Sequence, residues 1–236
     1  DGTNVYTQPG GLFGLIKDST QFDTDINIIN KGTRHDPDIF IFGVGGNFKG
    51  YYPRYSDDVY KTQNMVSWLI LKGHTSNRGE VKLRSSNPLD TPIINFKYFG
   101  DPAAGVNPSN EHKQDLDALL KSVKLTRKAV KKASAKLIAG KYREVWPGVE
   151  VNTDKEIKDY IMRESWGHHA SCTAKIGSEA DSMAVLTSDF RVKGVKNLRV
   201  VDASVFPKIP GFFPALAVYM MSEKAGDLIA EQDIDG

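Results

Sequence analysis

A long amphipathic segment in the middle of the chain limits its possible folds more than any other feature. The pair Asn107-Pro108 is a suitable helix start, with the Asn as N-cap, and Gly140 follows the last apolar residue. The pattern between them predicts one long helix that buries a single face against the rest of a domain. Its apolar residues recur at helical spacing: Leu116, Leu119, Leu120, Val123, Val130, Ala133 and Leu137.

Short strand-like segments precede this helix. Residues 38–42 are apolar, residues 65–84 predict a hairpin around a turn at 77–79, and residues 92–96 predict a further short strand. Residues 1–35 are rich in Gly, Asn, Thr and Asp, and they predict loops with a short helix near 12–16. The order of these segments indicates an α+β fold, in which an antiparallel sheet is flanked by helices.

A glycine cluster follows the first of these strands. Gly43-Val44-Gly45-Gly46 is similar to the glycine-rich loop of dinucleotide-binding proteins. However, its third glycine comes too early for the fingerprint of that loop, and no amphipathic helix follows. An irregular loop is the better interpretation.

The bulk properties exclude several classes of protein. The 236 residues suffice for one large domain or two small ones, and a formal net charge of +2 gives no indication of nucleic-acid binding. No stretch reaches the roughly 20 apolar residues that a membrane helix needs. Cys172 is the only cysteine, which excludes an internal disulfide and a cysteine-cluster zinc site. Nothing in the sequence indicates a cellular compartment.

The last third of the chain surrounds a histidine-containing loop. Thr153 and Glu156 have the spacing of a capping box, so we expect a short helix that leads into the loop. Residues 198–201 predict a buried strand. A closing helix is predicted after Pro210 from a second apolar stripe, which consists of Val218, Met221, Ala225, Leu228 and Ile229.

The loop at 165–177 places His168 and His169 side by side among small residues. A metal site is disfavoured, because adjacent histidines tend to point in different directions and no further ligand set accompanies them. Three interpretations stay open. They are a Cys172 nucleophile near a histidine, a structural histidine that satisfies a buried carbonyl, and a general acid–base histidine, which titrates near neutrality.

Residues 169–236 closely resemble the C-terminal end of the glucose–methanol–choline (GMC) family of FAD-dependent oxidoreductases. The family's motif of the type His-Pro-Val-Gly-Thr-Cys-Lys-Met-Gly matches residues 169–177 at its His, Thr, Lys and Gly. Residues 189–207 and 223–229 resemble the family's signature run toward the flavin and its last helix. The resemblance implies that His169 is the base that accepts the hydroxyl proton of an alcohol, while the substrate carbon gives a hydride to flavin N5.

The same resemblance implies which residues contact FAD. Asp202 and Ala203 are expected at its pyrophosphate and ribityl part. Family members usually carry a second His or Asn, and counting back from Glu223 puts that position at Ala215. Either this second role is vacant, or His168 or the N-terminal polypeptide supplies it. The residues expected against the isoalloxazine ring are Phe213, Pro214, Ala215 and Leu216.

The family's N-terminal glycine-rich βαβ unit, which holds the ADP half of FAD, has no counterpart here. We therefore expect residues 1–164 to form a substrate-binding domain. Residues 165–236 should complete an FAD-binding domain that is carried mostly by an N-terminal polypeptide of the same enzyme. The expected activity is the oxidation of a small-molecule alcohol to the carbonyl compound. The alternatives are a non-oxidative flavin enzyme of the same fold, such as a lyase or a photodecarboxylase, and a non-catalytic fragment.

Overall fold

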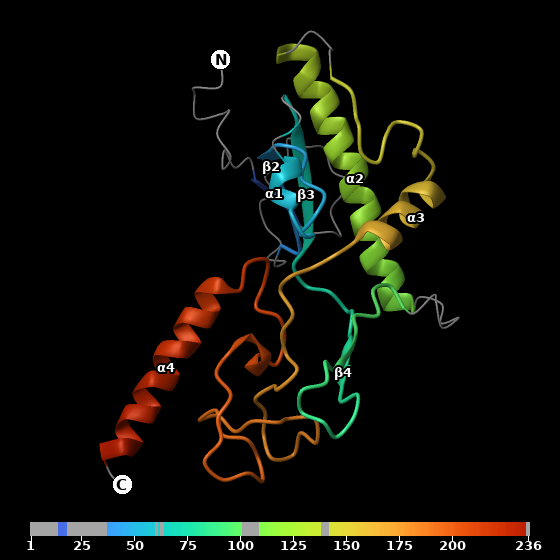
Figure 1. The fold of residues 1–236 in the computed structure, drawn as a ribbon. Coiled ribbons are helices and arrows are strands. Elements are labelled where there is room, and N and C mark those ends of the chain that lie inside the picture. Colours follow the sequence, from blue (N-terminus) through green and yellow to red (C-terminus); the bar gives the residue numbers. More distant parts are fainter. Residues whose placement is uncertain are drawn as a thin grey trace. The chain divides into compact units, whose positions relative to one another are not determined.

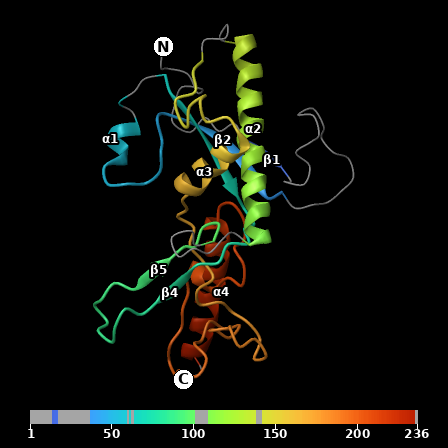
Figure 2. The same ribbon diagram turned by 90° about the vertical axis from the view of Figure 1, so that its right-hand side faces the viewer.

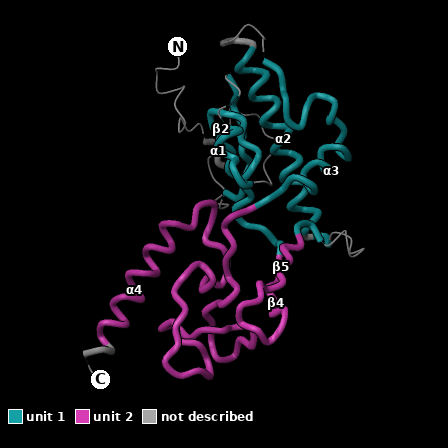
Figure 3. Tube along the Cα trace, in the orientation of Figure 1, with its two compact units in different colours: residues 1–77, 98–166 teal, residues 78–97, 167–236 magenta. Residues whose placement is uncertain are grey.

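The computed structural model describes residues 14–17, 37–59, 61, 64–100, 109–137 and 142–234. The chain divides into two compact units, residues 1–77 with 98–166 and residues 78–97 with 167–236 (Figure 3). The assignment of residues 1–164 to substrate binding and of residues 165–236 to FAD binding stays a prediction. None of the described helices is both long enough and apolar enough to cross a membrane.

The first unit contains a three-stranded antiparallel sheet. Its strand order is β1 (Gly14–Lys17), β2 (Ile39–Gly45) and β3 (Val66–Lys72). The short helix predicted near residues 12–16 is therefore wrong where the chain is described, because a short apolar run can form a strand as readily as a helical turn. The irregular loop predicted for the glycine cluster is also wrong in part, because β2 continues through Gly45.

The hairpin predicted over residues 65–84 is wrong. β3 pairs with β2, whereas β4 (Glu80–Lys82) pairs with β5 (Ile93–Asn95) in a separate two-stranded sheet. The alternation of polar and apolar side chains determines which residues share a face of a strand, and it leaves the pairing partner open. The strand predicted at 92–96 is confirmed as β5.

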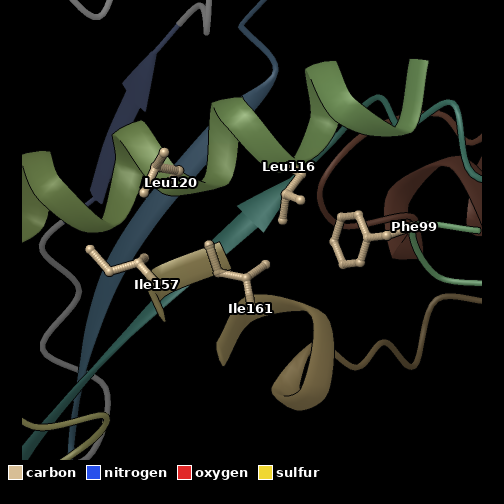
Figure 4. Close-up of a cluster of buried hydrophobic side chains, with 5 residues drawn as sticks. All are labelled: Phe99, Leu116, Leu120, Ile157 and Ile161. Carbon is tan, nitrogen blue, oxygen red and sulfur yellow. The ribbon is translucent and has the colours of Figure 1, made fainter. Parts of the chain in front are cut away.

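One long helix packs against the first sheet, and a second helix packs on the long one. α2 (Asn110–Leu137) lies beside β2 and β3 (Figures 1 and 2), and its Ala118 packs against Ile39 and Ile41. α3 (Asp154–Glu164) packs on α2, and the capping box predicted at its start is present. The buried contact between them is formed by Phe99, Leu116, Leu120, Ile157 and Ile161 (Figure 4). The predicted ends of α2, at 107–108 and 140, lie outside the described residues.

The first unit also contains a short helix, α1 (Tyr55–Val59), between β2 and β3. The second unit has little regular structure besides β4, β5 and two helical elements. These are the short 3₁₀ turn η3 (Ala203–Val205) and the closing helix α4 (Ala215–Ile234), which is confirmed. The core of the second unit consists of Leu186, Phe190, Val205, Met221 and Ala225.

The buried strand predicted at residues 198–201 is wrong. A single bridge joins Arg191 to Arg199, and Leu198 is 48% exposed. A strand requires a ladder of backbone hydrogen bonds with a neighbour, and the described residues of this unit supply an isolated bridge instead.

Candidate active site

The two histidines lie in the loop shortly after the end of α3 at Glu164, and they differ in exposure. His168 is exposed, His169 is half-buried, and their ring centroids are 4.3 Å apart at an interplanar angle of 60°. Among the residues that the structure describes, no group of three or more His, Cys, Asp or Glu side chains gathers as a metal site requires.

Backbone hydrogen bonds attach the residues after His169 to the segment that begins at Asp202. Three amides of the loop donate to three successive carbonyl oxygens at 3.2, 3.0 and 2.9 Å: Cys172 to Ala203, Ala174 to Ser204 and Ile176 to Val205. The Asp202 carboxylate accepts the N–H of Ser204 at 2.8 Å and so caps η3. The histidine loop and the Asp-Ala-Ser segment are therefore held side by side.

The lysine and the glycine of the histidine motif have local structural roles. Lys175 Nζ lies 2.6 Å from Asp181 Oδ2, and the hydrogen bond from Lys175 lowers the pKa of Asp181. A Cβ added at Gly177 would lie 2.7 Å from the Cβ of Ala184 and 3.0 Å from Asp181 Oδ2. Because the first of these contacts is shorter than two carbon atoms allow, the loop closes around Gly177 only in the absence of a side chain.

His169 lines an open depression of about 340 Å³ together with residues at the start of α4. The ring of Phe213 lies 6.1 Å from the imidazole of His169 at 72°, and Phe213 is 55% exposed. The remaining lining residues are Pro214, Ala215, Val218 and Tyr219. Apart from the imidazole of His169 and the hydroxyl of Tyr219, the side chains that line the depression are apolar.

The pKa of His169 is held below its ordinary value. Partial burial is the main cause, because it disfavours the charged imidazolium, and the neighbouring His168 acts in the same direction. A hydrogen bond with the backbone of Phe212 opposes them. The imidazole of His169 is therefore neutral near pH 7 and able to accept a proton.

The structure brings together part of the set of residues predicted for the site. Leu216 is 70% exposed and does not line the depression. His168 contacts the site through its ring, which lies against that of His169. Ala203 is connected to the site through the hydrogen bond that its carbonyl oxygen accepts from the backbone amide of Cys172. Four predicted residues line the depression: His169, Phe213, Pro214 and Ala215.

Val218 and Tyr219 complete the lining; Val218 was expected only in the apolar stripe of the closing helix, and no motif marks Tyr219. They follow Pro214 and Ala215 by four positions, and residues at this spacing share a face of a helix. That spacing is the signal by which the sequence could have identified them.

Comparison with known proteins relates the chain to one group of oxidoreductases. Residues 75–222 match the family model described as GMC oxidoreductase. The chain is 36% identical over 154 residues to the oxygen-dependent choline dehydrogenase of Vibrio vulnificus, a match that covers 65% of this chain and 25% of that protein. It is 35% identical over 171 residues to the chloroplastic fatty acid photodecarboxylase of Chlamydomonas reinhardtii, covering 71% of this chain and 26% of that protein.

A solved structure of a fungal aryl-alcohol oxidase has a similar fold. It superposes with a TM-score of 0.59 at 26% identity, over 84% of this chain and 28% of that one. The chain thus spans about a quarter of the length of the relatives that it matches.

Proposed function

Because the chain belongs to the GMC oxidoreductase family, we propose that it forms part of an FAD-dependent enzyme that oxidises an alcohol to its carbonyl compound. FAD is the cofactor of this family. The observation that carries the proposal is the position of His169, half-buried beside Phe213 in an otherwise apolar depression. A single neutral base in an apolar wall suits the removal of a proton from a hydroxyl group.

In this proposal His169 accepts the hydroxyl proton of the alcohol. Burial lowers the pKa of His169, so that the imidazole has a free nitrogen lone pair at neutral pH. Once the proton is on His169, the negative charge left on the substrate oxygen favours loss of a hydride from the neighbouring carbon.

The residues around the depression fit the flavin part of FAD. The isoalloxazine ring system is flat and aromatic, and Phe213, Pro214 and Tyr219 offer it an apolar surface beside the small side chain of Ala215. α4 begins at Ala215. The first N–H groups of a helix have no partner within the helix and carry partial positive charge, so this end of α4 would favour negative charge on the flavin ring. Bound FAD supplies the acceptor for the hydride.

Two further residues are assigned to the rest of the cofactor. Asp202 is exposed and Ala203 is half-buried, so both are accessible to the pyrophosphate and ribityl part of FAD. The backbone hydrogen bond between Cys172 and Ala203 links the position of the cofactor to that of the base.

We assign the remainder of the FAD site to an N-terminal FAD-binding polypeptide of the same enzyme. The chain spans about a quarter of the length of its relatives, which leaves most of such an enzyme to other residues. On α4, Leu216 is 70% exposed and Met220 is 67% exposed. Large apolar side chains exposed together on one helix commonly mark a surface that another segment covers.

An anaerobic absorption spectrum of the flavin-loaded enzyme tests the proposal. Addition of a panel of alcohols in the dark should bleach the flavin band, because the hydride reduces the flavin. If no alcohol bleaches the band while a chemical reductant does, alcohol oxidation is excluded for this enzyme.

A light-driven decarboxylation is the second candidate function. It is favoured by the 35% identity to the fatty acid photodecarboxylase and by the apolar lining of the depression. If this is the function, alcohols should not bleach the flavin band in the dark. Illumination should instead convert an added fatty acid to a hydrocarbon and carbon dioxide.

A further inference from the structure

Besides His168, the side chain of Phe213 is in ring contact with His169, and it lies two positions before Ala215, where the resemblance puts the family's second polar residue. The separation of 6.1 Å between the two rings falls within the range of roughly 4.5–7 Å that is typical of aromatic pairs. With 55% of its surface exposed, Phe213 still presents ring surface to a bound molecule. A substrate whose hydroxyl reaches His169 must therefore lie close to a phenyl ring.

The lining of the depression offers few partners for a highly polar substrate. Among the residues that the structure describes, those that line it include no carboxylate, lysine or arginine, and their polar side-chain groups are the imidazole of His169 and the hydroxyl of Tyr219. A sugar would bring several hydroxyls that lose their bonds to water on entry, and a buried hydroxyl without a partner is unfavourable. A cationic alcohol would find no opposite charge on these side chains.

We propose that Phe213 determines substrate specificity and that the alcohol is neutral and aromatic, with its ring held against Phe213 and its hydroxyl on His169. This inference rests on the alcohol oxidation proposed above, and it adds the class of substrate and the residue that selects it. Oxidation of such an alcohol yields an aromatic aldehyde. Its hydroxyl proton passes to His169 and its hydride passes to FAD, so that protons and electrons balance.

Benzyl alcohol and cyclohexylmethanol provide the test, because both are primary alcohols with a six-membered carbon ring and only one is aromatic. In the flavin-loaded enzyme, kcat/KM should favour benzyl alcohol over cyclohexylmethanol, choline and glucose. Phe213→Leu keeps an apolar side chain and removes the ring. The preference for benzyl alcohol over cyclohexylmethanol should then fall by about 2- to 10-fold, which corresponds to the loss of one aromatic pair.

Two further variants separate a specific role from a structural one. Phe213→Tyr retains the ring and should retain the preference. Phe96→Leu removes a phenylalanine that is 50% exposed in the same unit and does not line the depression, so the preference should not change. In every variant kcat/KM is expressed per bound flavin, because Phe213 is also assigned to the surface that faces the flavin.

The outcomes distinguish this inference from the proposed function. If no alcohol reduces the flavin, the proposed function fails and the inference fails with it. If the flavin is reduced but choline, glucose or cyclohexylmethanol is the better substrate, alcohol oxidation stands and the role of Phe213 is overturned. An equal effect of Phe213→Leu on all alcohols also overturns it.

Discussion

The backbone amide of Cys172 donates a hydrogen bond to the carbonyl oxygen of Ala203 at 3.2 Å. This bond joins the histidine loop to the segment that we assign to the cofactor. Cys172 has a φ of 73°, in the left-handed region that residues other than glycine seldom adopt. The turn that follows His169 therefore depends on a backbone conformation at Cys172 as well as on its hydrogen bond.

Replacement of Cys172 separates this backbone role from a chemical one. Cys172→Gly should retain flavin reduction, because glycine adopts a positive φ without strain. Cys172→Val should lower the free energy of unfolding by about 1–2 kcal/mol, because a β-branched residue is strained there. Denaturant unfolding and flavin reduction measure the two effects. A loss of reduction in Cys172→Gly would instead support a thiol nucleophile.

Replacement of His169 tests its role as the base. His169→Ala should lower the rate of flavin reduction by alcohol about 10²- to 10⁴-fold, because the hydroxyl proton loses its acceptor. The flavin should stay bound, since the apolar lining is unchanged. Stopped-flow absorbance measures the rate, and the visible spectrum of the purified variant measures the bound flavin.

His74 provides the control for this variant. It is exposed in the first unit, so His74→Ala should leave the rate unchanged. A rate for His169→Ala equal to that of His74→Ala would remove His169 from the mechanism.

The pH dependence of the reaction should report the environment of His169. Burial and the neighbouring His168 both lower the pKa of His169, in that order. The neutral imidazole is the base, so activity is lost as the pH falls through this pKa. His168→Gln removes one of the two causes, so the pKa of His169 should rise and the acidic limb of the rate profile should move to higher pH. An unmoved limb would show that His168 has no electrostatic effect on the base.

Gly177 should not tolerate a side chain. Gly177→Ala should lower the free energy of unfolding by about 1–3 kcal/mol, because the new Cβ meets the Cβ of Ala184. The double variant Gly177→Ala with Ala184→Gly should recover part of this loss, since the closest contact is removed. Thermal unfolding of both variants and of Ala184→Gly alone measures the coupling. Additive effects would mean that the two positions do not interact.

Local patterns in the sequence predicted several elements correctly. The capping box of Thr153 and Glu156 marks the start of α3, because its hydrogen bonds form within one helical turn. The apolar stripe of α2 likewise predicted the buried side in the first half of the helix, as at Leu116 and Leu120, whereas Ala133 of the same stripe is exposed. These signals involve residues close together in the chain, so they can be recognised without knowledge of the fold.

Strand pairing was predicted less well. The segments now seen as β3 and β4 were both recognised as strands, yet they were paired with each other, although β3 pairs with β2 and β4 with β5. The buried strand expected at 198–201 is an isolated bridge for the same reason, because a strand depends on a partner that its own residues do not specify.

The sequence by itself determined the three longer helices α2, α3 and α4, the histidine motif and its resemblance to one family, since these depend on spacing over a few residues. Only the tertiary structure decided that Phe213 faces His169, that Val218 and Tyr219 complete the depression, and that burial lowers the pKa of His169. These properties arise where segments far apart in the chain pack together and exclude water, and neither packing nor the loss of water is encoded in the spacing of residues along one segment.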